Sequence, residues 1–134
     1  MNTSAAKSYK GFTLVEIMIV VAIIALLAAI AVPGFLRARK RSQASRVVND
    51  LRLIDSAVDQ YAIENNKLTG SSVNTDDWTV YMKKGSALYN TGADLYGNGY
   101  GVQTVDQLPK VPATTWNTLS DVAGTEFFSP YGHL

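Results

Sequence analysis

An uninterrupted apolar run from Phe12 to Val32 constrains this chain more than any other feature. These 21 residues contain Glu16 as their only charged side chain and Thr13 as their only other polar one. As an α-helix, a run of this length extends about 32 Å, which matches the hydrocarbon core of a bilayer. The run therefore predicts a helix that is surrounded by apolar material, either lipid or other helices.

Two simple interpretations of this run stay open. It can be a plain membrane anchor, or it can be a secretory signal peptide with basic Lys7 and Lys10 before it and a small-residue cleavage site at 29–31. Two features disfavour the signal peptide: the run is longer than the usual apolar region of about 7–15 residues, and it carries a glutamate. Charge does not settle the orientation, because the basic residues within 37–41 follow the span closely and the positive-inside rule alone favours an outside N-terminus.

Glu16 is informative because an ionised carboxylate costs several kcal/mol in the hydrocarbon core. It lies about 6 Å along the helix from Phe12, so one interpretation is an interfacial side chain that reaches water. The other interpretation is a charged partner. Cleavage between Gly11 and Phe12 would create a cationic α-amine four residues before Glu16. That amine, on the same chain or a neighbouring one, would neutralise the carboxylate and would offset its own unfavourable position at a helix N-terminus.

The segment from Lys10 to Val21, with the apolar run that continues to Pro33, resembles the prepilin leader junction of type IV pilins and type II secretion pseudopilins. The matching features are a basic residue, Gly11, Phe12, a glutamate four positions later and a long apolar helix. The resemblance implies removal of residues 1–11 by a membrane prepilin peptidase and methylation of the new Phe12 amine. It also implies that Glu16 guides the docking of subunits into a growing filament.

The same resemblance implies a single-pass protein of the inner membrane with its N-terminus in the cytoplasm. The implied partners are membrane lipid before assembly, the prepilin peptidase and methyltransferase, an inner-membrane assembly platform, and other copies in a homo-oligomeric filament. That filament would be periplasmic or on the cell surface. The choice between a type IV pilus and a type II secretion system stays open, although the turn at 94–100 and the absence of cysteine favour a major pseudopilin.

Pro33 and Gly34 interrupt the helical pattern just after the apolar run. Proline leaves the carbonyl of Ala29 without its partner and glycine weakens the helix further, which predicts either a helix end or a kink. The pattern that follows favours a kink or a locally melted stretch, with the helix ending at Asn65-Asn66. Apolar residues then recur at amphipathic spacing: Ala44, Val47, Val48, Leu51, Ile54, Val58, Tyr61 and Ala62.

The remainder of the chain is rich in Gly, Tyr, Thr and Asn. Segments 78–82, 100–105 and 126–128 have the composition of strands, and 113–122 can form one short helix. We therefore predict an α+β fold in which a long kinked N-terminal helix packs on a small β-rich head. The predicted organisation is a leader at 1–11, a transmembrane or filament-core helix at 12–36, an amphipathic continuation at 37–66, and a head at 67–134 whose core is completed by 44–62.

The segment from Asp94 to Tyr100 predicts a turn. It is also similar to the Asp-Pro-Trp-Gly-Asn-Pro-Tyr turn of major type II secretion pseudopilins, which in that family precedes a calcium-binding loop. Oxygen ligands suit calcium, and the candidates are Asp94, Asn98, Asp106 and Asp121. However, Leu95 and Gly99 replace the two prolines, Tyr96 replaces the tryptophan, and no dense Asp-rich loop follows. A calcium site is therefore one hypothesis and a simple turn is the other.

Composition restricts the remaining classes of function. The net charge of +1 is uninformative about nucleic acid, and we predict no nucleic-acid partner. The distribution of charge says more: residues 37–46 carry five basic side chains and no acidic one, whereas the chain from Val47 onward carries five basic and ten acidic ones. The absence of cysteine excludes a disulfide, a thiolate metal site and a catalytic cysteine. No nucleophile motif supports a membrane-anchored enzyme. The alternative to a filament subunit is thus a membrane-anchored or secreted soluble binding domain.

Overall fold

The computed structural model describes residues 2–6 and 9–134, so Lys7 lies outside the described residues. The chain divides into two compact units, one within residues 1–36 and one from Arg37 to Leu134. Helix α1 (Leu14–Glu64) supplies residues to both units. The first unit is the apolar part of this helix with the segment before it, and the second is the amphipathic part of the helix with the head.

In the first unit, apolar side chains are exposed on every side of α1, as Leu27 at 60% and Ile30 at 72% illustrate. Within the described residues, α1 is the one helix that is long and apolar enough to cross a membrane. Its hydrogen-bonded pattern continues through Pro33 and Gly34. A helix end or a melted stretch at this point was therefore the wrong interpretation, and the kink stays a prediction.

In the second unit, one face of α1 is buried, as the spacing of its apolar residues predicted. The buried residues are Ala44, Val47, Leu51, Ile54, Ala57, Val58 and Ala62. The helix ends at Glu64, where Asn66 adopts a left-handed conformation (φ 49°) and the N–H of Lys67 donates to the carbonyl of Ala62 at 2.9 Å. This arrangement is a Schellman-type C-cap with asparagine in place of glycine, and it confirms the predicted end of the helix.

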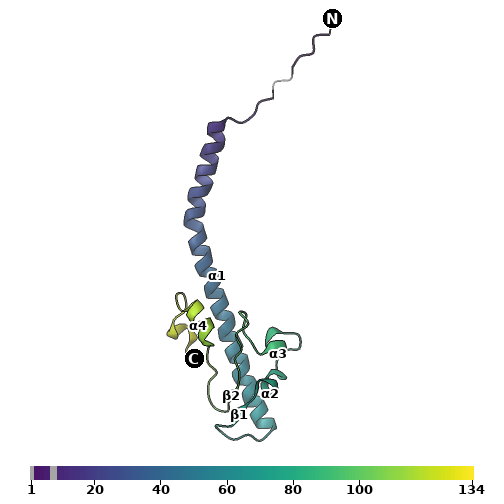
Figure 1. The fold of residues 1–134 in the computed structure, drawn as a ribbon, viewed down its shortest axis with the longest axis vertical. Helices are drawn as coiled ribbons and strands as arrows, with labels where there is room; N and C mark the ends of the chain where they lie inside the picture. Colours follow the sequence, from purple (N-terminus) through teal and green to yellow (C-terminus); the bar gives the residue numbers. More distant parts are fainter. Residues whose placement is uncertain (1, 7–8) are drawn as a thin grey trace. The chain divides into compact units, whose positions relative to one another are not determined.

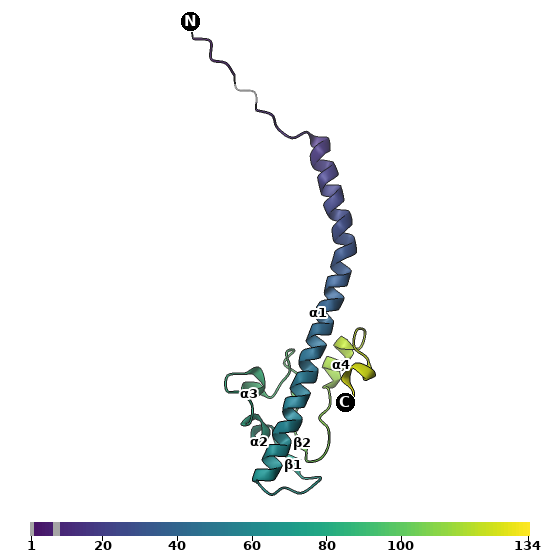
Figure 2. The same ribbon diagram turned by 180° about the vertical axis from the view of Figure 1, so that it is seen from behind.

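The head consists of short elements on two sides of the C-terminal part of α1. These elements, in chain order, are β1 Ser72–Val73, α2 Thr75–Thr79, α3 Ala87–Thr91, β2 Gln103–Thr104, α4 Ala113–Leu119 and α5 Thr125–Phe128. Helices α2 and α3 lie on one side of α1 and α4 on the other (Figures 1 and 2). Strands β1 and β2 pair antiparallel, with Ser72 opposite Thr104 and Val73 opposite Gln103.

The α+β class and the helix predicted within 113–122 are confirmed, but two predicted strands are wrong. Segment 78–82 falls on α2 and the turn after it, and 126–128 belongs to α5. Of the strand predicted at 100–105, only β2 forms. Short apolar runs fit a strand and a buried helical turn equally well. At α2 local capping favours the helix, because the Asp77 carboxylate accepts the backbone N–H of Asn74 at 3.2 Å.

The buried face of α1 and the head share one hydrophobic core. Trp78 from α2 and Phe128 from α5 are its largest fully buried side chains. The indole Nε1 of Trp78 donates to the carbonyl of Gly101 at 3.1 Å, so its polar atom is satisfied. Gly92 ends α3 in a left-handed conformation (φ 59°), and a Cβ at this position would collide with the methyl group of Thr75.

Candidate functional site

The bond between Gly11 and Phe12 lies in the segment that precedes α1. Helix α1 begins two residues after Phe12, and neither residue belongs to a helix or a strand. Phe12 is 84% exposed, and a Cβ placed on Gly11 would have no neighbour within 4 Å. The backbone here is exposed and makes no helical hydrogen bonds, which is the condition that proteolytic cleavage requires.

Thr13 is the N-cap of α1 and positions Glu16 in the first helical turn. The side-chain Oγ1 of Thr13 accepts the backbone N–H of Glu16 at 3.2 Å, and the carbonyl of Thr13 accepts the N–H of Ile17 at 3.3 Å. A carboxylate in the first turn interacts favourably with the helix dipole. Sequence reasoning missed this cap, although Thr-x-x-Glu before an apolar run is the capping-box pattern.

Phe12 and Glu16 line the same shallow hollow of about 510 Å³, together with three aliphatic side chains: Ile17, Ile19 and Val20. A new α-amine on Phe12 would therefore lie on the same side of the helix start as the carboxylate. When lipid or other helices cover these apolar walls, a charge pair formed there becomes stronger, because Coulomb attraction rises as the local dielectric constant falls.

The four calcium candidates have different partners in the structure. Asp94 and Asn98 share one turn, whereas Asp121 pairs with Lys40 at 2.8 Å and Asp106 accepts the hydroxyl of Thr69. Within 2–6 and 9–134, no group of three or more His, Asp or Glu side chains is arranged to hold a metal ion. These residues do not form a ligand set that fits calcium, and the calcium site stays a prediction without structural support.

Asp94 organises the turn by itself. It is only 4% exposed. Its Oδ1 accepts the backbone N–H groups of Tyr96 at 2.9 Å and Asn98 at 3.0 Å, and its Oδ2 accepts the hydroxyl of Thr115 on α4. The side chain of Asn98 also donates to Thr115, at 2.8 Å. The carboxylate therefore holds the turn together and ties it to α4, so the two segments are fixed without an added cation.

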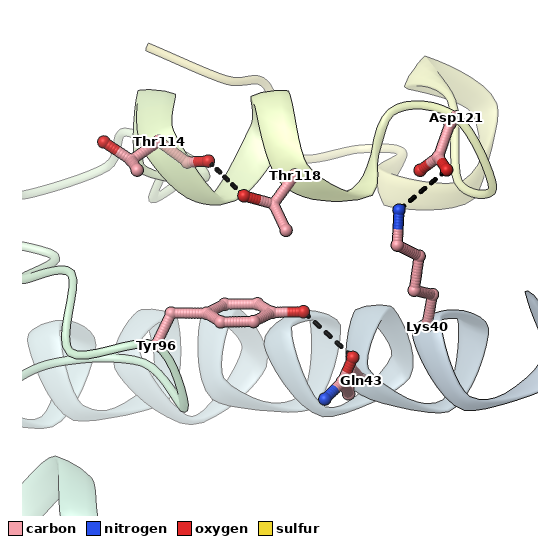
Figure 3. A network of polar contacts seen from close by, with 6 residues as sticks. All are labelled: Lys40, Gln43, Tyr96, Thr114, Thr118 and Asp121. Carbon is pink, nitrogen blue, oxygen red and sulfur yellow. Dashed lines mark hydrogen bonds and ion pairs between the residues drawn. The ribbon is translucent and has the colours of Figure 1, made fainter. Parts of the chain in front are cut away.

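Two polar contacts attach separate segments of the head to neighbouring turns of α1 (Figure 3). Tyr96 donates its hydroxyl to Oε1 of Gln43 at 3.0 Å, and Lys40 pairs with Asp121 at 2.8 Å. The hydrogen bond from Lys40 lowers the pKa of the Asp121 carboxyl. Sequence reasoning did not identify these pairs, because their members are 53 and 81 residues apart and no local pattern links them.

A third polar contact lies deeper between α1 and the head. The hydroxyl of Tyr100 donates to the carboxylate of Asp50 at 3.2 Å. Burial raises the pKa of Asp50 despite this hydrogen bond and the nearby Arg46. Burial, together with the negative charge of Asp50, also raises the pKa of Tyr100. At neutral pH the pair is thus a neutral phenol bound to a partly desolvated carboxylate, a contact that orients the head but costs some stability.

Comparison with known proteins adds an independent line of support. A family model described as the prokaryotic N-terminal methylation motif matches residues 6–32. The chain is 40% identical over 70 residues to a fimbrial protein of Pseudomonas aeruginosa, covering 52% of this chain and 46% of that protein. It is 36% identical over 61 residues to type II secretion system core protein G of Klebsiella michiganensis, covering 46% of this chain and 43% of that protein. No solved structure matches the chain significantly.

The chain thus spans about half the length of these two relatives. The type IV major fimbrial protein FimA of Dichelobacter nodosus is 40% identical over 105 residues, covering 66% of this chain and 67% of that protein. A match to 66% of the chain includes residues beyond the end of α1, so the similarity reaches into the head. On the motif at 6–32 and on these alignments, the chain belongs to the type IV pilin and type II secretion pseudopilin family.

Proposed function

We propose that this chain is a structural subunit of a helical filament that is assembled from the inner membrane, in a type IV pilus or a type II secretion system. One observation carries the proposal: the apolar side chains of α1 up to Leu36 are exposed on every side, whereas the face from Ala44 to Ala62 is buried by the head. The exposed part needs apolar surroundings. Lipid supplies them before assembly, and the helices of neighbouring subunits supply them within a filament.

The geometry of the N-terminal segment supports processing as the switch between these two states. The exposed bond after Gly11 is the proposed cleavage site of a prepilin peptidase, and the Phe12 amine is the proposed methylation site. Cleavage removes the leader and creates a cation beside the hollow that contains Glu16. Pairing with a subunit's amine lowers the cost of placing the Glu16 carboxylate among apolar helices, so the pair favours docked subunits.

N-terminal sequencing of the mature protein tests the proposal directly. We expect methylated phenylalanine at position 12 as the first residue. A mature protein that begins at Val32 would indicate a signal peptide and a soluble product, and an intact Met1 would indicate a plain membrane anchor. Either outcome would contradict the proposed function.

The role of Glu16 in assembly is a separate prediction. Glu16→Ala and Glu16→Gln should both insert into the membrane and be cleaved, but they should form far fewer filaments, because neither side chain can neutralise the amine. Ile17→Ala is the matched control, since Ile17 lines the same hollow without carrying charge. Filament yield from sheared cells, quantified against total membrane-bound subunit, is the measurement. Yields equal to those of the unmodified chain would remove Glu16 from the mechanism.

A further inference from the structure

A second hollow, of about 400 Å³, lies at the C-terminal end of α1 and is unrelated to the processing segment. Its lining consists of Asp59, Ala62, Ile63, Lys67, Leu68, Thr69, Val105 and Asp106. Ile63 is 77% exposed and Leu68 is 79% exposed, so two large aliphatic side chains face solvent at one place. The carboxylates of Asp59 and Asp106 are exposed at the same hollow.

This combination of chemistry fits a long side chain with an apolar stem and a cationic end. The stem of an arginine packs on aliphatic surface, and its guanidinium presents five N–H donors to nearby carboxylates. Lys67 lines the hollow too, but its ammonium lies 6.0 Å from the centre of the Tyr61 ring. Within the described part of the chain, neither Asp59 nor Asp106 forms an ion pair, and Asp106 uses one carboxylate oxygen to accept the hydroxyl of Thr69, which leaves the other oxygen for a cation.

The basic segment at residues 37–46 contains arginines that suit this hollow. Two of its cations are already engaged within the chain, since Lys40 pairs with Asp121 and Arg41 lies over the ring of Phe127 at 5.7 Å. Arg37 and Arg39 are exposed, and they form no ion pair among residues 9–134. Along α1, 26 residues separate Arg37 from Ile63, which corresponds to about 39 Å of helix. These arginines therefore cannot reach the hollow of their own chain.

We propose that the hollow formed by Asp59, Ile63, Leu68 and Asp106 receives Arg37 or Arg39 of a second copy of this chain. The two surfaces lie at opposite ends of the second unit, so each copy offers one hollow and one pair of arginines. Such a contact is heterologous: it leaves a free surface at each end, and it builds an open filament when the rotation between successive copies does not close a ring. The inference rests on the proposed function and names a pair of surfaces through which neighbouring heads meet.

Charge exchange tests this contact. Asp59→Arg with Asp106→Asn replaces the two negative charges of the hollow with one positive charge, and Arg37→Asp with Arg39→Asp replaces the two arginines with carboxylates. Asparagine is chosen at position 106 because it tolerates the left-handed backbone there (φ 63°). Each pair of substitutions should lower filament yield at least about tenfold through like-charge contact. Combining all four should restore most of the yield, because the attraction is re-established with its sign reversed.

Matched controls are Asp76→Arg and Arg52→Asp, which make the same charge changes at exposed positions outside the hollow. We expect neither control to lower the yield. Equal losses from the controls, or no restoration in the fourfold variant, would overturn the inference. Absence of filaments from the unmodified chain would instead contradict the proposed function, so the two failures are distinguishable.

Disulfide cross-linking gives a second test that does not depend on charge, and the chain has no cysteine of its own to interfere. Ala38→Cys lies between the two arginines, and Lys67→Cys lies at the hollow. Oxidised filaments of the double variant should give a ladder of covalent oligomers, whereas a mixture of the two single variants should give only dimers. Filaments of the double variant that stay monomeric after oxidation would overturn the proposed contact.

Discussion

Replacing Asp94 should destabilise the head through identifiable hydrogen bonds. Asp94→Ala leaves the N–H groups of Tyr96 and Asn98 and the hydroxyl of Thr115 without their acceptor. A buried donor left unsatisfied costs about 1–3 kcal/mol, and water reaches part of this turn, so we expect a total loss of about 3 kcal/mol. For a domain of roughly 100 residues this corresponds to a decrease in Tm of about 12–24 °C.

Asp94→Asn should lower the stability of the head less than Asp94→Ala does. This variant isolates the contribution of the hydrogen bond from Thr115 to Asp94. An asparagine oxygen can still accept both backbone N–H groups of the turn. Its NH₂ group would face Oγ1 of Thr115, which already accepts the amide of Asn98 at 2.8 Å, so the Thr115 hydroxyl loses its acceptor. One unsatisfied hydroxyl costs about 1.5 kcal/mol, which corresponds to about 6–12 °C in Tm.

The assay is thermal unfolding of the whole chain in detergent micelles, followed by near-ultraviolet circular dichroism. Both tryptophans, Trp78 and Trp116, lie in the head, so this signal reports the unit that contains the turn. Asp76→Asn is the control, because it removes an exposed carboxylate and should leave Tm almost unchanged. Equal melting of Asp94→Ala and the unmodified chain would refute the reasoning, and equal losses from the alanine and asparagine variants would refute the assignment to Thr115.

Three further predictions concern the second unit. Burial raises the pKa of Asp50 above its ordinary value of 3.8, so this group contributes stability that is fully present below pH 3.8 and is lost as pH rises through the folded-state pKa. Asp50→Asn should therefore melt higher than the unmodified chain at pH 7, and the gap should vanish in melts below pH 3.8. Gly92→Ala places a side chain on a left-handed backbone and makes it collide with Thr75, so it should lower the free energy of unfolding by about 2 kcal/mol or more. At Gly97 the backbone is also left-handed but a Cβ meets open space, so Gly97→Ala should lower it only by the backbone strain of about 1 kcal/mol. Urea unfolding of both variants separates the collision from the strain. Finally, removing calcium with EGTA should leave the Tm of the head unchanged, because the candidate calcium ligands have other partners. An increase in Tm of several degrees on adding millimolar calcium would contradict this prediction and show that calcium binds.

The parts of the structure that follow from sequence are those that a single periodic pattern specifies. The apolar run predicts the helical part of the first unit because all its side chains except Thr13 and Glu16 are apolar, whichever way they point. The face from Ala44 to Ala62 follows from its helical spacing, and Asn66 follows from the tolerance of asparagine for the left-handed conformation. In each case one local rule applies and no distant residue competes with it.

The short helices of the head follow no such pattern. Tryptophan is a residue type that strands favour, yet Trp78 lies on a helix of five residues whose N-cap is Asn74. Its side chain is fully buried in the core. Elements this short are too small to be stable alone, so tertiary packing decides between helix and strand. The contacts of Lys40 with Asp121 and of Gln43 with Tyr96 depend on where those elements finally pack, and composition does not reveal it.

The turn at Asp94 illustrates why a similar sequence need not carry a similar ligand. An aspartate followed four residues later by asparagine is enough to specify a turn in which one carboxylate oxygen accepts two backbone N–H groups. When the other oxygen accepts a buried hydroxyl from α4, the carboxylate is satisfied without a cation. Calcium binding needs further oxygen ligands brought to the same place, whereas Asp106 and Asp121 bind Thr69 and Lys40 instead. The hydrogen bonds of Asp94 and Asn98 to Thr115 therefore dock the 94–100 segment on α4, with both carboxylate oxygens of Asp94 already engaged.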